Sequence, residues 1–223
     1  MYSSIKSAAV LGIDAYQVNV ETHLDSKLPK FIIVGLPDGA VKEASERVRA
    51  AIKNSDLLFP RKRVVINLAP ADIRKGGSSF DLPMAIGILA ATGLVNPVEA
   101  NSFLFTGELS LDGSLQRSRG VLSIAVSAKQ NEIAKIMLPR DNVSEASNVD
   151  GVEIYGVTSL QEAVAILNGQ SQVKPQKTRP EELLAARVSS GDDFADVKGQ
   201  EHAKRALEAV SYTHLRAHET PIN

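Results

Sequence analysis

The sequence has no cysteine and no tryptophan among its 223 residues. Without thiols the chain can form neither a disulfide nor a thiolate metal site, and it offers no cysteine nucleophile. Its histidines are scattered without the spacing of metal ligands: His23, His202, His214 and His218. We therefore expect no metal site in this chain.

The chain also lacks an excess of charge of one sign and a long apolar run. Its 25 basic and 26 acidic residues leave a formal net charge of -1, so no global attraction to nucleic acid or membrane is indicated. The first residues, MYSSIKSAAVLGIDAYQV, have no continuous apolar core of the signal-peptide kind. No apolar run approaches the roughly 20 residues that span a bilayer. We expect a cytoplasmic protein without a membrane partner.

Apolar periodicity predicts an α/β domain over residues 1–169. The predicted strands are residues 8–13 and 16–21, joined by a turn at Asp14-Ala15, and residues 31–34, 64–68, 136–138 and 152–155. A further hairpin is predicted from residues 103–111 and 113–115, with its turn at Asp112-Gly113. The predicted helices are residues 40–54, 82–91, 119–130 and 158–167, the last with a capping box of Ser159 and Glu162.

The composition changes after this domain. Residues 170–193 are polar and contain Pro175 and Pro180, as linkers do. Residues 194–210 begin a further unit, in which a helix from about Gln200 is expected to bury Ala203, Ala206, Leu207 and Val210. Residues 211–223 show no strand or helix period, and we expect this tail to be disordered or foreign to the rest of the chain.

Residues 64–93 join an apolar strand to an apolar helix through the loop Gly76-Gly77-Ser78-Ser79. A Ser or Asp side chain could cap the helix, and Pro83 suits its first turn, so a structural cap is the simplest interpretation. The loop could instead bind an anion at the helix N-terminus, although it lacks the Gly-x-x-x-x-Gly-Lys-Ser/Thr pattern of a phosphate loop. A serine nucleophile served by a lysine base is the third hypothesis.

Basic residues gather in three places that could contact a phosphate backbone. These are Arg61, Lys62 and Arg63; Arg74 and Lys75; and Arg117 with Arg119. Few aromatic residues accompany them, and solvated surface is the commoner meaning of such clusters. DNA binding through these residues is kept as a hypothesis.

Four phrases follow one another along the chain: VGLP, NLAPAD, FDLP and TGELSLDG. With these, and with the segment DFADVKGQEHAKRALE, residues 1–210 closely resemble the magnesium-chelatase-like AAA+ ATPases of the YifB/ComM family. The resemblance implies a Lon-protease-domain-like unit, a two-layer α/β fold also seen in a ribosomal small-subunit protein, followed by an AAA+ module. For the full-length protein it implies ATP and Mg²⁺ as cofactors, a hexamer, and ATP-driven DNA branch migration in natural transformation.

By the same resemblance, Val197, Lys198, Gly199 and Gln200 stand at the entry of the AAA+ module, where relatives contact adenine. A phosphate loop, an acidic Mg²⁺-binding motif and an arginine finger are expected next, whereas the chain continues as SYTHLRAHETPIN. We interpret this ending as truncated. We expect residues 1–223 alone to bind no cofactor and to be catalytically silent, serving assembly or DNA engagement.

The resemblance to Lon proteases also tests the serine hypothesis. Alignment with their Lys-Asp-Gly-Pro-Ser-Ala-Gly segment places Ser79 at the nucleophile. Continuing from Thr106-Gly107-Glu108 places Leu122 at the catalytic lysine, and leucine cannot act as a base. Lys75 and Lys129 lie in the same region of the sequence, but nothing puts either beside Ser79. A residual Ser79 peptidase is therefore retained only as the alternative function.

Overall fold

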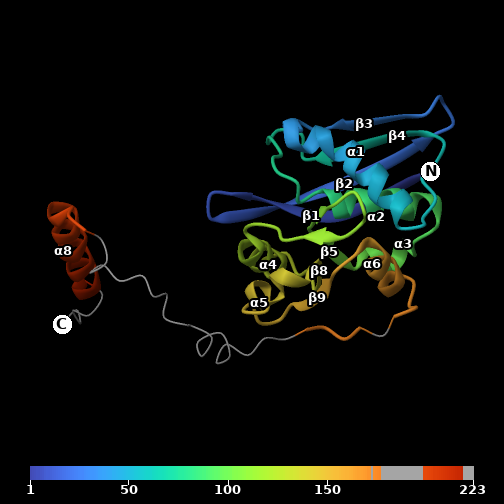
Figure 1. The fold of residues 1–223 in the computed structure, drawn as a ribbon. Coiled ribbons are helices and arrows are strands. Elements are labelled where there is room, and N and C mark those ends of the chain that lie inside the picture. Colours follow the sequence, from blue (N-terminus) through green and yellow to red (C-terminus); the bar gives the residue numbers. More distant parts are fainter. Residues whose placement is uncertain (172, 177–197, 218–223) are drawn as a thin grey trace. The chain divides into compact units, whose positions relative to one another are not determined.

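The structure is a computed structural model that describes residues 1–171, 173–176 and 198–217 (Figure 1). It divides into two compact units, Met1–Pro180 and Glu181–Asn223, and each is described by itself. This division falls inside residues 170–193, the segment expected to be a linker. Within that segment Gln176 donates its amide to the carbonyl of Ile154, while residues 177–193 lie outside the described residues.

The first unit alternates strands and helices, as the periodicity predicts. Its strands are β1 (Tyr2–Leu11), β2 (Asp14–Asp25), β3 (Lys30–Val34), β4 (Arg63–Ala69), β5 (Phe103–Phe105), β6 (Glu108–Leu109), β7 (Leu115–Gln116), β8 (Lys135–Pro139) and β9 (Glu153–Val157). Its helices are α1 (Gly39–Asn54), α2 (Asp81–Thr92), α3 (Pro97–Asn101), α4 (Val121–Gln130), the 3-10 turn η1 (Arg140–Asn142), α5 (Val143–Ala146) and α6 (Leu160–Leu167). The short elements α3, η1 and α5 were not predicted, because segments of three to five residues carry too little periodicity.

Seven strands form one mixed sheet in the order β3-β4-β2-β1-β5-β8-β9. The pairs β4–β2 and β2–β1 are antiparallel, whereas β3–β4, β1–β5, β5–β8 and β8–β9 are parallel. The β1–β2 hairpin is longer than predicted and turns at Gly12-Ile13, because Leu11 already pairs with Asp14. The predicted turn at Asp14-Ala15 is therefore wrong by two residues.

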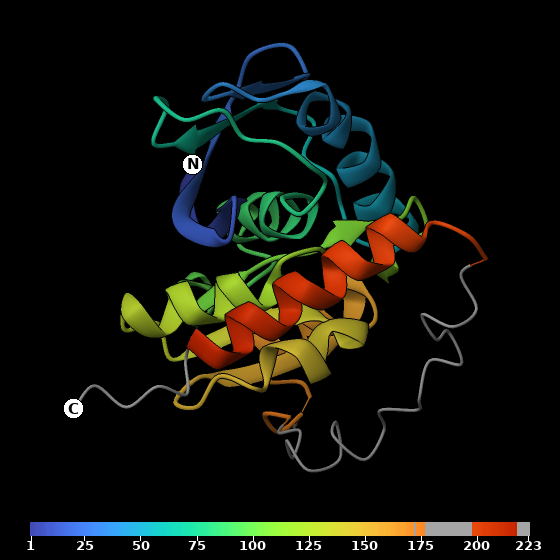
Figure 2. The ribbon, with the colours of Figure 1, turned by 90° about the vertical axis from the view of Figure 1, so that its left-hand side faces the viewer.

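One face of the sheet is covered by α1, α2 and α6, and Figure 2 shows α1 and α2 on the same side of the strands. The predicted inner face of α1 is confirmed, since these side chains are buried: Val41, Ala44, Val48, Ala51 and Ile52. Helix α2 is buried along nearly its whole length, which explains why its sequence is apolar all round. The turn between β3 and α1 lies close to β4. A Cβ on Gly35 of the VGLP phrase would lie 2.3 Å from the Leu68 carbonyl oxygen.

The other face carries α4 and α5 over β5, β8 and β9, and α4 also contacts β1 and β2. Side chains alternate accordingly: Leu104 and Ile136 pack toward α4, whereas Phe103 and Met137 pack toward the α2 side. The predicted α/β class is confirmed. Helices therefore cover both faces of the sheet, so the unit has one helical layer more than the expected two-layer fold.

The predicted hairpin of residues 103–115 is divided in two. Phe103–Phe105 (β5) enters the main sheet between β1 and β8, and only β6 and β7 form the hairpin. Its turn lies at Asp112-Gly113 as predicted, with Asp112 accepting from the amide and hydroxyl of Ser114. Sequence alone could not separate β5 from β6, because both are short and only two residues lie between them.

The N-terminal cap of α6 is confirmed, since Ser159 accepts from the Glu162 amide. The return half of the capping box differs, because the Glu162 carboxylate accepts from the amide and hydroxyl of Thr158.

In the second unit the described residues form one helix, α8 (Glu201–Ala217). Its start near Gln200 is confirmed. The expected burial is wrong within the described residues, because Leu207 and Val210 are 53% and 55% exposed and Ala203 and Ala206 are also exposed. The helix also continues through residue 217, where no helix was predicted. Residues 218–223 lie outside the described part.

No helix among the described residues is both long and apolar enough to cross a membrane.

Candidate functional site

A hollow of about 420 Å³ lies beside the loop that joins β4 to α2. Residues 76–79 of that loop contribute one part of its wall, and residues 117–119, between β7 and α4, contribute another. Glu108 of β6, Ala8 and Val10 of β1 and Ile124 of α4 complete the lining. The hollow therefore brings together the Gly-Ser loop and Arg117, which are far apart in the sequence.

The first turn of α2 has no free N–H group to offer an anion. The Asp81 amide donates to the Ser78 carbonyl (3.2 Å), and the Leu82 amide donates to the Gly107 carbonyl (3.0 Å). Pro83 has no amide hydrogen. The N-cap residue makes no side-chain capping bond, so the predicted Ser or Asp cap is wrong. Anion binding at this helix N-terminus fails for the same reason, because neighbouring carbonyls already accept from its donors.

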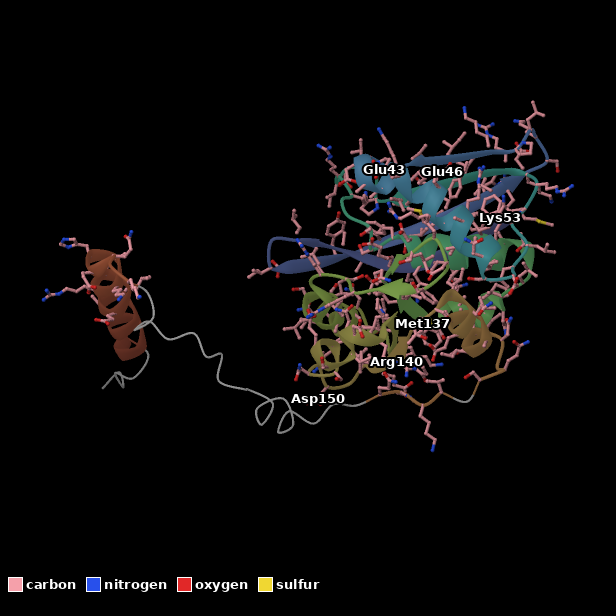
Figure 3. The ribbon with its side chains drawn as sticks, viewed as in Figure 1. Glu43, Glu46, Lys53, Met137, Arg140 and Asp150 are labelled. Carbon is pink, nitrogen blue, oxygen red and sulfur yellow. The ribbon has the colours of Figure 1, made fainter. Side chains whose placement is uncertain are left out.

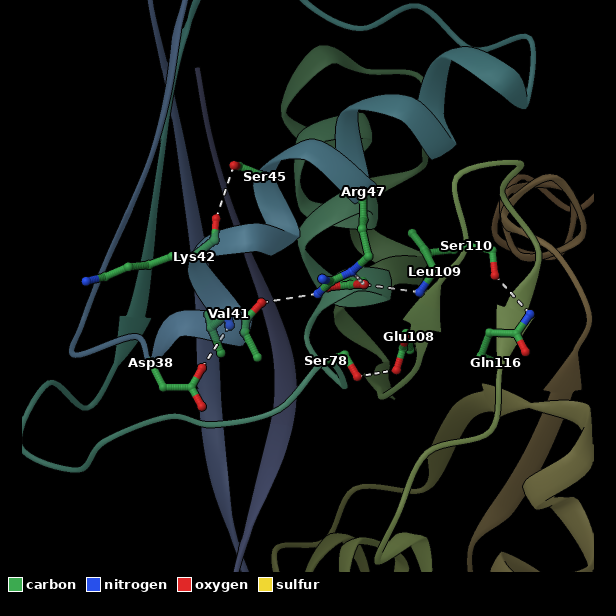
Figure 4. A network of polar contacts seen from close by, with 12 residues as sticks. Asp38, Val41, Lys42, Ser45, Arg47, Ser78, Glu108, Leu109, Ser110 and Gln116 are labelled. Carbon is green, nitrogen blue, oxygen red and sulfur yellow. Dashed lines mark hydrogen bonds and ion pairs between the residues drawn. The ribbon is translucent and has the colours of Figure 1, made fainter.

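Asp81 is fully buried and forms an ion pair with Arg47 of α1, which Figure 4 labels. Arg47 Nε donates to Asp81 Oδ2 at 2.7 Å and Nη2 donates to Oδ1 at 3.0 Å. The Leu109 amide donates to the same carboxylate at 3.2 Å. Burial raises the pKa of Asp81 to about 6, while the hydrogen bond and the charge of Arg47 act in the opposite direction. The pair links α1, α2 and β6 around the hollow.

The two loop serines differ in their contacts. The Ser78 hydroxyl donates to the Glu108 carboxylate (Figure 4), whereas the Ser79 hydroxyl makes no hydrogen bond among the described residues. A serine nucleophile requires a base within hydrogen-bond reach. No lysine or histidine of the described residues lines this hollow.

The lysine candidates lie elsewhere. Leu122, at the position of the Lon lysine, is 45% exposed and lines a different hollow with Ile13 and Asp14. Lys75 is fully buried, and its Nζ has no hydrogen-bond partner among the described residues. Burial lowers its pKa. Lys129 is exposed in the last turn of α4. The structure therefore assembles no Ser-Lys pair around Ser79 in the described residues.

Three of the predicted DNA-contact residues come together at the start of β4. Arg61 and Lys62 line a hollow of about 390 Å³. Arg63 lines a neighbouring hollow of about 520 Å³, and Pro29 lines both. Figure 3 labels Lys53, which lies on α1 and lines the smaller of the two. We call the following side chains the basic cluster: Lys27, Lys30, Arg49, Lys53, Arg61, Lys62 and Arg63.

The other predicted DNA contacts are not part of this cluster. Arg74 is exposed in the β4–α2 loop, and Arg117 lies at the 420 Å³ hollow with Arg119. Lys75 must be corrected as a surface contact, because its side chain is fully buried while its backbone pairs with Leu36 and Asp38. The pattern of charges along the chain could not show this, since adjacent residues of an extended segment face opposite ways.

Sequence reasoning also missed the Arg47–Asp81 pair. Two signals were present. Asp81 stands in the FDLP phrase at the start of a wholly apolar helix, where an isolated carboxylate calls for a partner. Arg47 lies three residues after Ala44 and four before Ala51, beside the buried face of α1.

The residues expected to contact adenine belong to the second unit. Lys198, Gly199 and Gln200 are exposed and precede α8, and Val197 lies outside the described residues. No group of three or more His, Cys, Asp or Glu side chains that could hold a metal ion occurs in the described part of the chain.

Comparison with known proteins identifies the family. The sequence pattern described as subunit ChlI of Mg-chelatase matches residues 20–142. Competence protein ComM of Haemophilus influenzae is 40% identical over 205 residues, covering 91% of this chain and 40% of ComM. YifB of Escherichia coli is 38% identical over 209 residues, covering 94% of this chain and 40% of YifB.

A shorter similarity reaches Lon protease 2 of Bacillus subtilis, which is 32% identical over 109 residues, or 48% of this chain and 19% of the protease. The chain thus spans about 40% of the length of the ComM and YifB relatives that it matches. The match of the ChlI pattern and the extended similarity to ComM and YifB agree with each other. The chain belongs to the magnesium-chelatase-like family that includes ComM and YifB.

Proposed function

We propose that this chain is the N-terminal part of an ATP-driven motor that moves branch points in DNA, and that Met1–Pro180 engages DNA without catalysing a reaction itself. Family membership supports the motor, as does similarity to a protein named for competence. In this proposal the complete protein works in the cytoplasm as a homo-hexamer and uses ATP and Mg²⁺. Those cofactors act in the AAA+ module, of which residues 194–210 are the start.

The observation that carries DNA engagement is the basic cluster. Seven lysine and arginine side chains line two neighbouring hollows at one end of the sheet. Lys27 forms an ion pair with Asp25 at 3.3 Å, and Arg49 lies over the ring of Phe59. No ion pair is found for the other five among the described residues. Unpaired guanidinium and ammonium groups at this density suit a phosphate backbone.

The shape of this surface also favours an extended polyanion. The two hollows meet at Pro29 and together run from the end of α1 to the start of β4. Arg49 Nε and Arg63 Nε are buried without a hydrogen-bond partner in the described part of the chain. Both nitrogens are closed to solvent, so a phosphate would contact the exposed Arg61 of the cluster instead.

The test is binding of a labelled four-way DNA junction to residues 1–223, measured by fluorescence anisotropy over a range of salt concentrations. Replacing Arg61 and Lys62 by alanine should weaken binding at least tenfold. It should also reduce the slope of log affinity against log salt by about 2, because each lost phosphate contact contributes roughly 0.9. The matched control replaces two exposed lysines outside the cluster, Lys42 and Lys129, by alanine.

An equal loss in both double variants would show that net charge alone attracts the DNA, and it would overturn the proposal. So would the absence of salt-sensitive binding by the unmodified chain, which would leave assembly as the role of this unit. Competition with a linear duplex of the same length then shows whether the branch itself is recognised.

A further inference from the structure

The hydroxyl of Ser118 is an unsatisfied donor at the edge of the 420 Å³ hollow. Ser118 is only 6% exposed, and its Oγ has no hydrogen-bond partner among the described residues. A buried hydroxyl without a partner lowers stability, so proteins rarely keep one without a use. The position of Ser118 in the wall of the hollow suggests that the partner comes from outside the chain.

The segment that carries this hydroxyl is held in place from both sides. The fully buried Asn142 accepts from the Ser118 amide at 2.9 Å and donates to the Ser118 carbonyl at 2.8 Å. Gly120 approaches β1 so closely that a Cβ there would lie 2.7 Å from Val10 Cγ2, and its φ is +70°. The backbone of Ser118 is therefore fixed in the wall of the hollow.

The surrounding groups are mostly hydrogen-bond donors. Arg119 is exposed at the rim and forms no ion pair in the described part of the chain, while Arg117 is 3.7 Å from Glu145. The backbone amides of Ser78 and Ser79 donate no hydrogen bond among the described residues, and the Ser79 hydroxyl is also free. The single carboxylate in the lining is Glu108, which already accepts from Ser78. Because Arg117 is paired with Glu145, Arg119 and the Glu108 carboxylate balance each other, and the free hydrogen-bond donors rather than a net charge favour an anion here.

We propose that this hollow binds a phosphate group. Donors are present in three separate segments, the loop of residues 76–79, Ser118 and the two arginines, and a tetrahedral oxyanion can accept from all of them at once. The site differs from a helix N-terminus, because the amides of α2 are already used. Arg117, Ser118 and Arg119 also line a neighbouring hollow, but Glu145 is part of that lining and its carboxylate disfavours an anion there.

The phosphate could be free inorganic phosphate or the 5′-terminal phosphate of a DNA strand, and the two sources share the same chemistry. The inference is independent of DNA binding by the basic cluster. Either proposal can fail while the other holds, because junction binding is measured with variants of Arg61 and Lys62, whereas phosphate binding is measured with variants of Ser118 and Arg119.

The test is a titration of ¹⁵N-labelled protein with inorganic phosphate, followed by amide chemical shifts. We expect saturable shifts of the Gly77, Ser78, Ser79 and Ser118 amides, with potassium chloride at equal ionic strength as the reference. Ser118→Ala and Arg119→Ala should each weaken binding at least fivefold. Lys42→Ala, which removes one positive charge outside both the hollow and the basic cluster, should leave the affinity unchanged.

Ser118→Ala retains the two backbone bonds to Asn142, so it should fold, and its thermal unfolding midpoint provides a second readout. Phosphate should raise the midpoint of the unmodified protein and should not raise that of the variant. A 5′-phosphorylated dinucleotide and its unphosphorylated form then distinguish the two sources. Shifts without saturation, shifts equal to those in chloride, or equal binding of both dinucleotides at these amides would overturn the proposal.

Discussion

Arg47 binds both carboxylate oxygens of Asp81, at 2.7 and 3.0 Å, and so joins the middle of α1 to the first residue of α2. The Arg47 side chain is 22% exposed, whereas that of Asp81 is fully buried. A carboxylate in this position is tolerated only because a planar guanidinium matches its two oxygens. The geometry of the Gly-Ser loop, which ends at Asp81, depends on this pair.

Removing Arg47 should therefore destabilise the first unit strongly. Arg47→Ala leaves the Asp81 carboxylate buried without its partner, for which we expect a loss of about 3–5 kcal/mol in the free energy of unfolding. The measurement is urea unfolding followed by circular dichroism at pH 7. Lys42→Ala, an exposed position of the same helix, serves as the control and should change stability by less than about 0.5 kcal/mol. Equal effects of the two substitutions would contradict a structural role for the pair.

Asp81 should also give the protein a pH-dependent stability. Its pKa is about 6 in the folded protein, above the ordinary value of 3.8, so the folded state holds the proton more tightly than the unfolded state does. The stabilising contribution of the protonated carboxyl is full below about pH 4 and is lost as the pH rises through 6, a change of about 3 kcal/mol.

The measurement compares the free energy of unfolding of the unmodified protein with that of Asp81→Asn between pH 4 and pH 7. Because other titrating groups are common to both proteins, the difference between them isolates Asp81. As the pH rises, the free energy of unfolding of the unmodified protein should fall relative to that of Asp81→Asn. A constant difference across this range would mean that Arg47 keeps the carboxylate ionised throughout.

Replacing Lys75 should stabilise the protein, whereas replacing Arg47 should destabilise it. Its ammonium is buried without a partner in the described part of the chain, and burial lowers its pKa, so the charge opposes folding. Lys75→Met keeps the length of the side chain and removes the charge, and should raise the free energy of unfolding by about 1–2 kcal/mol. The same substitution at the exposed Lys42 should have little effect. A loss of stability in Lys75→Met would show that the ammonium has a favourable contact.

Restoring a lysine at position 122 should not create a peptidase. The side chain at this position lines the hollow of Ile13 and Asp14, and the Leu122 amide donates to Glu145. A lysine there has no hydrogen-bond path to Ser79. We expect no fluorophosphonate labelling of Ser79 in Leu122→Lys at pH 8, with an active Lon protease as the positive control. Labelling that disappears in Leu122→Lys/Ser79→Ala would establish the peptidase alternative.

Much of the fold could be predicted because its signals are local. The inner face of α1 follows from apolar residues at helical spacing, and the Ser159 cap follows from a side chain that reaches the Glu162 amide three residues away. The place of β5 in the main sheet could not be predicted, because Phe105 pairs with Ser7, which lies 98 residues earlier in the chain. Pairing at such a separation depends on the packed core.

In the candidate site, too, features with a local sequence signal could be predicted, and features that depend on distant segments could not. The Gly-Ser loop stands out in the sequence, and the distance of Ser79 from a usable base was anticipated from Leu122. The use of the α2 amides by Gly107 and Ser78, and the burial of Lys75, depend on segments that meet only in the folded chain. The Ser118–Asn142 contact joins residues 24 apart and has no sequence signature.

The central position of β1 has a consequence for synthesis on the ribosome. One edge of β1 pairs with β2, which follows it directly. The other edge pairs with β5, and the Ser7 hydroxyl of β1 donates to the Phe105 carbonyl, 98 residues later. At a synthesis rate of about 5–20 residues per second, the second edge stays open for roughly 5–20 seconds. An open strand edge can pair with another chain. The first hundred residues of a nascent chain thus expose an unpaired edge of β1 until β5 of the same chain is made and pairs with it.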